Sequence, residues 1–163
     1  MINRRTVYAA VLFFNLIRPV EATEDPSLTI VIGKAEQTIT KTELAKRLMP
    51  AEITVYSPVY QRPMTYQGFW LDDILSTFHA AIPEDGDIAF QSTDGYGTSM
   101  TAHELGRQKW LVAYGQPEGW APLPERKMRT LPGPWYVVGR ESSSYREFPW
   151  PYQVTAIKIR GEW

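Results

Sequence analysis

After residue 22 the apolar residues of this chain come in short runs, and this limits the fold more than any other feature of the sequence. Apolar or alternating runs of about four to eight residues between turn residues are typical of strands. The sequence predicts strands at residues 28–32, 36–40, 53–57, 87–92, 109–114, 135–138 and 152–159. The first two strands, with Gly33 and Lys34 between them, are expected to form a hairpin.

Two segments have the pattern of short helices. Thr40 and Glu43 have the spacing of a capping box, so we expect a helix over residues 41–48. Residues 69–78 place apolar side chains three and four positions apart, which predicts a second helix. Residues 101–105 are expected to form at most one helical turn. The predicted fold class is therefore α+β, mostly β, in one compact domain with short helices.

The beginning of the chain has the features of a signal peptide. Two arginines precede an apolar run at residues 6–17, which is too short to cross about 30 Å of hydrocarbon as a helix. Small residues occupy the two positions that a signal peptidase reads before a cut after Ala22. We therefore predict a signal peptide at residues 1–22 and an exported domain at residues 23–163. The alternative is a buried amphipathic first helix, and the export route stays open.

Composition excludes several classes of function. The chain has no cysteine, so disulfides, thiolate catalysis and thiolate metal ligation are excluded. Removing residues 1–22 takes away three arginines and one glutamate, which leaves 14 basic and 17 acidic residues. A mildly acidic domain lacks the clustered excess of Lys and Arg that nucleic-acid binding requires. We expect no nucleic-acid partner.

Several segments together resemble one family, the sulfite-oxidase-type molybdopterin-binding domains. The similarity covers residues 27–160, and it is carried by the order and spacing of the motifs rather than by any one of them. The motifs are Tyr66–Leu75 (YQGFWLDDIL), Phe90–Tyr96 (FQSTDGY), Trp110–Tyr114 (WLVAY), Gly133–Val138 (GPWYVV) and Trp150–Val154 (WPYQV), with Ile157–Ile159. This resemblance implies a compact sulfite-oxidase-like fold.

The chain departs from the enzymes of this family in lacking the cysteine that holds their molybdenum. It is similar to compact, periplasmic pterin-binding regulators of the PruR type. That resemblance implies a non-catalytic protein that binds a reduced, dephosphorylated pterin in the periplasm. It also implies a partner, the periplasmic domain of a membrane protein with GGDEF or EAL domains that makes or degrades cyclic-di-GMP.

A pterin pocket needs a carboxylate and flat side chains. One carboxylate can accept from the N–H and the amino group on the guanine-like edge of a pterin, and Asp94 and Glu147 are our candidates because each lies beside aromatic residues in a loop. Asp94 is equally typical of a turn residue that bonds its own backbone, and Glu147 of a solvated loop charge. Both alternatives stay open.

Aromatic side chains and one arginine complete the expected pterin site. Trp135 and Tyr136 would face opposite sides of one strand, so at most one of them lines a given pocket. For each of these aromatic residues we favour a place in the core over contact with a ligand, because strands favour aromatic residues on packing grounds. The candidates are Tyr60, Tyr96, Trp135, Tyr136, Trp150 and Tyr152 for stacking or edge contacts, and Arg62 for donation to the pterin carbonyl and ring nitrogen.

Residues 115–129 are expected to form a long surface loop, of a kind that is often functional in compact domains. A phosphate on the ligand would need cations, and Arg126, Lys127 and Arg129 in this loop are candidates. Their spacing equally suits a solvated or partner-docking loop, which we favour. A pterin without phosphate is therefore the expected ligand.

Two other functions stay open. One is a subunit of an oxidoreductase, molybdopterin-dependent or otherwise, although no catalytic motif surrounds either histidine. The other is a non-covalent haem protein for electron transfer, with His79 or His103 as axial ligand and Met100 or Met128 as its partner. The chain contains no Cys-x-x-Cys-His, so covalent haem attachment is excluded.

Overall fold

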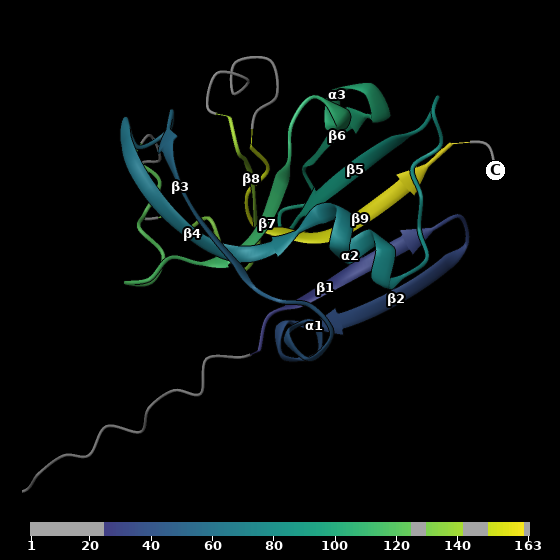
Figure 1. Cartoon of the computed structure of the whole chain (residues 1–163), viewed down its shortest axis with the longest axis horizontal. Helices are drawn as coiled ribbons and strands as arrows, with labels where there is room; N and C mark the ends of the chain where they lie inside the picture. Colours follow the sequence, from purple (N-terminus) through teal and green to yellow (C-terminus); the bar gives the residue numbers. More distant parts are fainter. Residues whose placement is uncertain (1–24, 125–129, 142–149, 162–163) are drawn as a thin grey trace, which may run out of the picture.

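The computed structural model describes residues 25–124, 130–141 and 150–161 (Figure 1). In these residues short strands dominate and three short helices lie between them, so the domain is α+β and mostly β, as predicted. The strands are β1 (Ser27–Ile32), β2 (Ala35–Thr40), β3 (Ala51–Ser57), β4 (Arg62–Trp70), β5 (Asp87–Ser92), β6 (Gly97–Thr101), β7 (Trp110–Gly115), β8 (Tyr136–Gly139) and β9 (Val154–Arg160). The helices are α1 (Lys41–Arg47), α2 (Leu71–Thr77) and α3 (Ala102–Gly106).

The strands form two sheets. The first has the order β2-β1-β9-β5-β6, and the second has the order β3-β4-β7-β8. All neighbouring strands are antiparallel except β1 and β9, which run parallel. The last strand of the chain therefore lies between the first strand and β5, which ties the two ends of the domain together.

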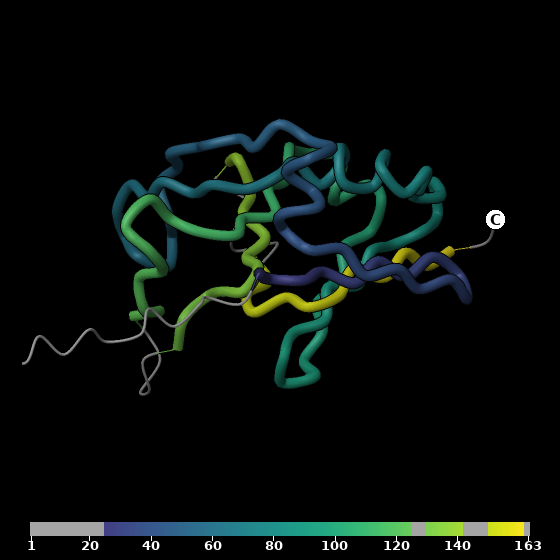
Figure 2. Tube along the Cα trace, turned by 90° about the horizontal axis from the view of Figure 1, so that it is seen from below, coloured from purple at the N-terminus to yellow at the C-terminus, as the bar shows by residue number. Residues whose placement is uncertain are grey.

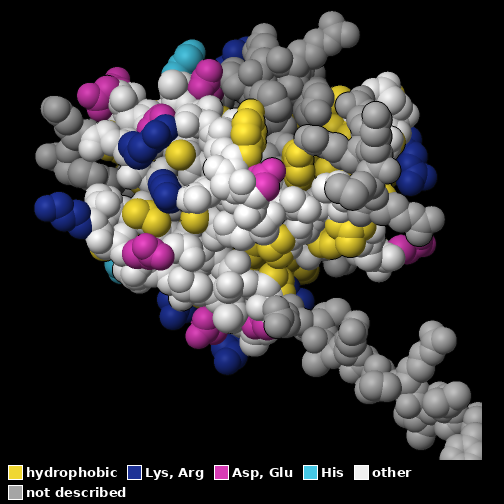
Figure 3. Space-filling model, turned by 180° about the vertical axis from the view of Figure 1, so that it is seen from behind, with side chains coloured by type: hydrophobic (Ala, Val, Ile, Leu, Met, Phe, Trp, Pro, Cys, Tyr) yellow, Lys and Arg dark blue, Asp and Glu magenta, His cyan; other side chains and the backbone are white. Residues whose placement is uncertain are grey.

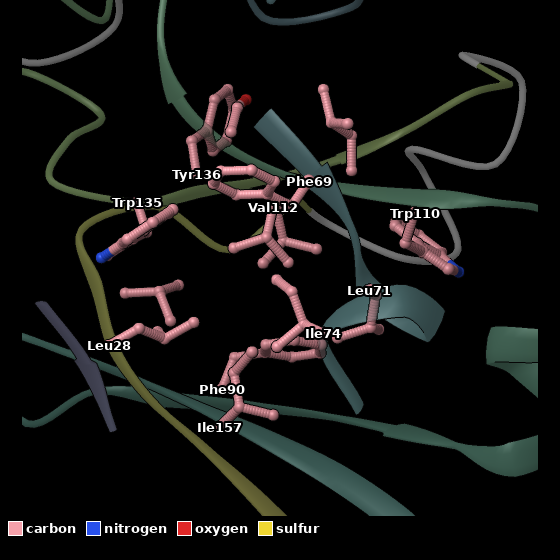
Figure 4. Packing of buried hydrophobic residues seen from close by; sticks show 14 of the residues in the cluster. Leu28, Phe69, Leu71, Ile74, Phe90, Trp110, Val112, Trp135, Tyr136 and Ile157 are labelled. Atoms are coloured by element: carbon pink, nitrogen blue, oxygen red, sulfur yellow. The ribbon is translucent and has the colours of Figure 1, made fainter. Parts of the chain in front are cut away.

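The core lies between the two sheets. The edge-on view in Figure 2 shows the sheets as two layers, and Figure 4 shows the side chains that meet between them. Phe69, Val112 and Tyr136 come from the second sheet, whereas Phe90 and Ile157 come from the first, and each is at most 1% exposed. Because the chain has no cysteine, burial of these apolar side chains is the main source of stability.

The beginning of α1 confirms the capping prediction. The Thr40 hydroxyl accepts from the Glu43 backbone N–H and the Glu43 carboxylate accepts from the Thr40 N–H, so α1 begins with the expected capping box. Thr101 and Glu104 form a second capping box that starts α3. This gives α3 more regular structure than the single helical turn expected there.

Two strands were not predicted from the local pattern of apolar residues. β4 carries Arg62, Pro63, Thr65 and Gln67, so its apolar positions are interrupted and do not read as a run. It also extends to Trp70, and for this reason α2 begins at Leu71 rather than at residue 69. β6 is short and has small polar side chains, and it forms because it pairs with β5 after a tight turn.

The proposed signal peptide, residues 1–22, lies outside the described residues. Within the described part of the chain, no helix has the length and apolar character needed to cross a membrane.

Candidate functional site

A pocket of about 360 Å³ lies between the start of β4 and the loop that follows β7. We call it the Trp120 pocket, because Trp120 is the one aromatic side chain among its described lining residues. Its lining comprises Arg62, Pro63, Met64, Thr65, Gln116, Pro117, Glu118, Gly119, Trp120 and Ala121. The two sides of the pocket come from segments about fifty residues apart in the sequence, brought together because β4 pairs with β7.

Two hydrogen bonds shape the loop over the pocket. The Tyr60 hydroxyl donates to the Ala121 carbonyl oxygen at 2.6 Å, and the Ala121 N–H donates to Gln116 Oε1 at 2.7 Å. Gly119 has a φ of +82°, a conformation that favours glycine, and its N–H donates to the Gln116 carbonyl at 2.9 Å. The loop therefore has a defined conformation, with Gln116 at its base.

Aromatic rings pack behind the pocket wall. Tyr136 is at the centre: its ring centroid lies 6.5 Å from that of Trp120, 5.7 Å from Tyr66 and 6.1 Å from Trp150, all in edge-to-face arrangements. Such edge-to-face pairs stabilise aromatic clusters beyond their burial alone. Trp120 is partly exposed, while the rings behind it are buried. The wall is therefore rigid and presents one indole to a ligand.

A buried polar cluster lies at the base of this region. Ser57 and Tyr66 are fully buried and Gln116 is 8% exposed. Tyr66 Oη and Gln116 Nε2 have no hydrogen-bond partner among the described residues. Because a buried polar atom without a partner costs free energy, such atoms mark a place where a water or a ligand atom binds.

The ionisation of two tyrosines reflects this environment. Burial raises the pKa of Tyr66 above its usual value, and the polar Ser57 and Gln116 side chains beside the hydroxyl oppose the shift. Burial, with a smaller contribution from Tyr66, raises the pKa of Tyr60 to about 12, and the Arg62 charge opposes that shift. Both hydroxyls are therefore protonated at neutral pH, and the Tyr60 hydroxyl donates to the Ala121 carbonyl.

The mouth of the pocket carries opposite charges. Arg62 and Glu118 are both exposed and both line it. A guanidinium donates to carbonyl oxygens and ring nitrogens, and a carboxylate accepts from N–H groups. Together with an indole face, this set suits a small flat ring that has donors on one edge and acceptors on another.

Four of the residues predicted for the site lie at or near this pocket. Arg62 lines it, Tyr60 holds its loop, and Tyr136 and Trp150 pack behind Trp120. Tyr136 and Trp150 are 1% and 3% exposed, so they support the wall rather than present a face to a ligand. Trp135 is fully buried on the other side of the strand, where its Nε1 donates to the Ser27 carbonyl at 2.9 Å. The opposite orientation of Trp135 and Tyr136 agrees with strand geometry.

Three other predicted residues lie together elsewhere, at the β5–β6 turn. Asp94 accepts from the Tyr96 N–H at 2.9 Å, which is the turn-forming role left open for it. Tyr96 is 70% exposed. Tyr152 is tied to the end of β5, because its backbone carbonyl accepts a hydrogen bond from Ser92 Oγ at 2.7 Å. Figure 2 shows this turn projecting from the lower layer. Glu147, Arg126, Lys127, Arg129 and Met128 lie outside the described residues.

The residues considered for a haem or metal site do not gather. His79 and His103 are exposed at different helices, and Met100 is buried in the core. Across residues 25–124, 130–141 and 150–161, no three histidine, aspartate or glutamate side chains are placed to hold a metal ion.

A larger cavity, of about 690 Å³, lies between α2 and α3. Leu71, Leu75 and Leu105 contribute to its apolar lining, and Lys109 and Arg140 are its cations. None of the predicted site residues lines it, and neither Tyr66 nor Gln116 does. We favour the smaller Trp120 pocket because buried polar atoms without partners adjoin it.

The surface seen from behind mixes charged and apolar side chains. Figure 3 shows the back of the molecule, where charged side chains of both signs are scattered and hydrophobic side chains surface in several separate patches. This face has no concentrated excess of Lys and Arg. The absence of a nucleic-acid partner stays a prediction.

Trp120, Gln116 and Glu118 were not singled out in the sequence. The available signal was the long loop at residues 115–129, which was expected to be functional and contains all three. Comparison with models of protein families and with curated proteins gives no match to this chain.

Proposed function

We propose that this protein is a non-catalytic binding protein for a reduced, dephosphorylated pterin, which binds in the Trp120 pocket. The observation that carries the proposal is the combination of an accessible indole wall, Arg62 at the mouth, and two buried polar atoms without partners at Tyr66 and Gln116. A pterin needs stacking on its face and hydrogen bonds on its edges, and this pocket offers both.

The size and charge of the pocket support a small ligand without phosphate. A volume of about 360 Å³ is at the lower end of the range for small-molecule sites, which suits a bicyclic ring with a short substituent. Among the described lining residues, Arg62 is balanced by Glu118. A phosphate would need an excess of cations at this mouth.

We also propose that the fold is sulfite-oxidase-like. In support, the motifs of the resemblance coincide with strands, a helix start and the segments that lead into strands. YQGFWLDDIL spans the end of β4 and the start of α2, FQSTDGY spans the end of β5 and the turn after it, and WLVAY forms most of β7. The closing motifs lead into β8 and β9 and include part of each strand, and these strands belong to two different sheets.

The proposed role is signalling rather than catalysis. The predicted signal peptide would send the domain to the periplasm, and a small-molecule sensor there can act on a membrane protein. We propose that pterin occupancy is reported to the periplasmic domain of a membrane protein with GGDEF or EAL domains. We expect the affinity of that domain for this protein to differ between the pterin-loaded and the empty form. Equal affinity for the two forms contradicts the proposal.

The binding proposal is tested by titrating the folded protein with reduced monapterin or neopterin and following tryptophan fluorescence and heat. We expect saturable binding, with a dissociation constant below about a millimolar, or about −4 kcal/mol. Trp120→Ala should weaken binding about tenfold to a hundredfold, because stacking of a ring on an aromatic side chain contributes about 1–3 kcal/mol. Absence of saturable binding by folded protein contradicts the proposal.

Arg62→Ala offers a second variant with a matched control. Arg62 lines the pocket, whereas Arg47 is exposed at the end of α1. We expect Arg62→Ala to weaken pterin binding and Arg47→Ala to leave it unchanged. If both substitutions have the same effect, the ligand binds elsewhere.

A further inference from the structure

Gln116 is held in one orientation by the loop above it. Its Oε1 accepts from the Ala121 N–H at 2.7 Å. Turning the amide over would place its NH₂ group against that N–H, two donors facing one another. The amide therefore keeps its oxygen toward Ala121, and Nε2 is the end that remains for another group.

Nε2 is buried and has no partner among the described residues. The side chain nevertheless belongs to the lining of the Trp120 pocket, with 8% of the residue exposed. An amide NH₂ can only donate, so the group that satisfies it must be an acceptor. A donor placed there would leave two buried polar groups unsatisfied instead of one.

The neighbouring Tyr66 hydroxyl does not require its partner to be a hydrogen-bond acceptor. It is fully buried and also lacks a partner, but a hydroxyl can either donate or accept. It therefore adapts to the ligand atom that it meets. Of the two unpartnered groups, Gln116 is the one that can distinguish a carbonyl from an amino group.

We propose that Gln116 is a specificity-determining residue, which selects ring systems that present a carbonyl oxygen and rejects analogues with an amino group at that position. This inference rests on the proposed function and makes it more specific. It assigns the carbonyl-bearing edge of the pterin to the base of the pocket, and it leaves the donor edge for the carboxylate of Glu118 at the mouth.

The test compares hydroxymethylpterin with its diamino analogue, in which an amino group replaces the ring carbonyl, both in the same oxidation state. The natural protein should bind the pterin at least about tenfold more tightly, since a polar site discriminates strongly against the wrong hydrogen-bonding group. Gln116→Glu keeps an acceptor for the Ala121 N–H and replaces the donor end by an acceptor oxygen. We expect this variant to prefer the diamino compound.

Two further variants keep the test decisive. Gln116→Met has a similar volume and no amide, so the ratio of the two dissociation constants should fall toward one even if Gln116→Glu does not fold. Gln37→Glu, an exposed change in β2 of the other sheet, should keep the natural ratio. Equal binding of the two compounds by the natural protein, or an unchanged ratio in a folded Gln116 variant, overturns this inference and leaves pterin binding intact. Failure of both compounds to bind overturns both proposals.

Discussion

The β5–β6 turn and the Trp120 pocket both contain residues with the chemistry of a pterin site, but they differ in how their polar atoms are satisfied. At the turn, Asp94 accepts from the Tyr96 N–H and Ser92 donates to a backbone carbonyl. At the pocket, Tyr66 and Gln116 keep buried polar atoms without partners in the described structure. The turn is complete by itself, whereas the pocket lacks hydrogen bonds that a ligand or water would supply.

This difference shows why aromatic and acidic residues close together in a sequence are weak indicators of a site. Asp94 lies beside aromatics because a tight turn connects two strands, and its carboxylate serves that turn. The pocket is indicated instead by what its residues leave unsatisfied.

The largest effect should come from Gly133→Ala. A Cβ built at Gly133 would lie 2.2 Å from Nε1 of the Trp120 indole, so the ring must move. We expect a loss of about 1–3 kcal/mol in the free energy of unfolding, as in other overpacked sites, together with weakened pterin binding. Chemical denaturation and fluorescence titration measure the two effects.

Gly106→Ala is the control for that substitution. No atom lies within 4 Å of a Cβ at this position in α3. Alanine also has a higher helix propensity than glycine. We expect unchanged or slightly increased stability and natural pterin binding. If Gly133→Ala binds pterin as tightly as Gly106→Ala, Trp120 does not form the ligand wall.

The next prediction compares the removal of one hydroxyl group from each region. Ser92→Ala removes a 2.7 Å hydrogen bond from a side chain that is 9% exposed, and should cost about 0.5–1.5 kcal/mol of stability. Tyr66→Phe removes a hydroxyl that has no partner, so the ligand-free protein should keep its stability or gain some. Thermal unfolding of both variants without ligand measures this contrast, and a large loss in Tyr66→Phe would show that its hydroxyl is already satisfied.

Much of the fold could be predicted from the sequence because it depends on local patterns. The capping box at Thr40 and Glu43 and the strand at residues 87–92 were both predicted and are both present. β4 was missed because its pattern is interrupted by Arg62 and Pro63, and its pairing with both β3 and β7 decides its conformation. Tertiary pairing here outweighs local preference.

The candidate site was predicted less completely, because its contacts join distant segments. The Tyr60 hydroxyl and the Ala121 carbonyl are 61 residues apart, and the loop between residues 115 and 129 has no periodic pattern that shows which side chains turn inward. Arg62 was found by its chemistry. Gln116 could not be found that way, since its role depends on the orientation that Ala121 imposes.

Tyr60→Phe should have an effect of the same size as Ser92→Ala, about 0.5–1.5 kcal/mol, because it removes one hydrogen bond that holds the loop. Tyr56→Phe is the matched control, since that hydroxyl is on an exposed side chain with a long 3.5 Å bond to Gln61. We expect Tyr60→Phe to weaken pterin binding through the loop, and Tyr56→Phe to leave both properties unchanged. Denaturation and titration of the two variants separate the loop contact from a general loss of a hydroxyl.

Because the pKa of Tyr60 is raised, we expect the stability of the protein to depend on pH in the alkaline range. Tyr60 keeps its proton up to a pKa of about 12 in the folded protein, whereas in the unfolded chain it loses the proton near its ordinary value of 10.0. Between these values the folded state binds more protons, so stability is complete below about pH 10 and falls as the pH rises toward 12. Tyr60→Phe should show a shallower fall over this window, and an identical slope would contradict the assignment of the shift to burial in the folded state.

The smallest effect should come from Asp94→Ala. The carboxylate is exposed and bonds only within its own turn among the described contacts, so its loss should change stability by no more than about 0.5 kcal/mol. Pterin binding should be unchanged, because the described lining of the Trp120 pocket does not include Asp94. A loss of binding with preserved stability would move the site to the β5–β6 turn, where Tyr96 and Tyr152 would supply the rings. The β5–β6 turn, and not the Trp120 pocket, would then be the binding site. In that case the Asp94 carboxylate would give up its hydrogen bond from the Tyr96 N–H and accept from the N–H groups of the ligand instead.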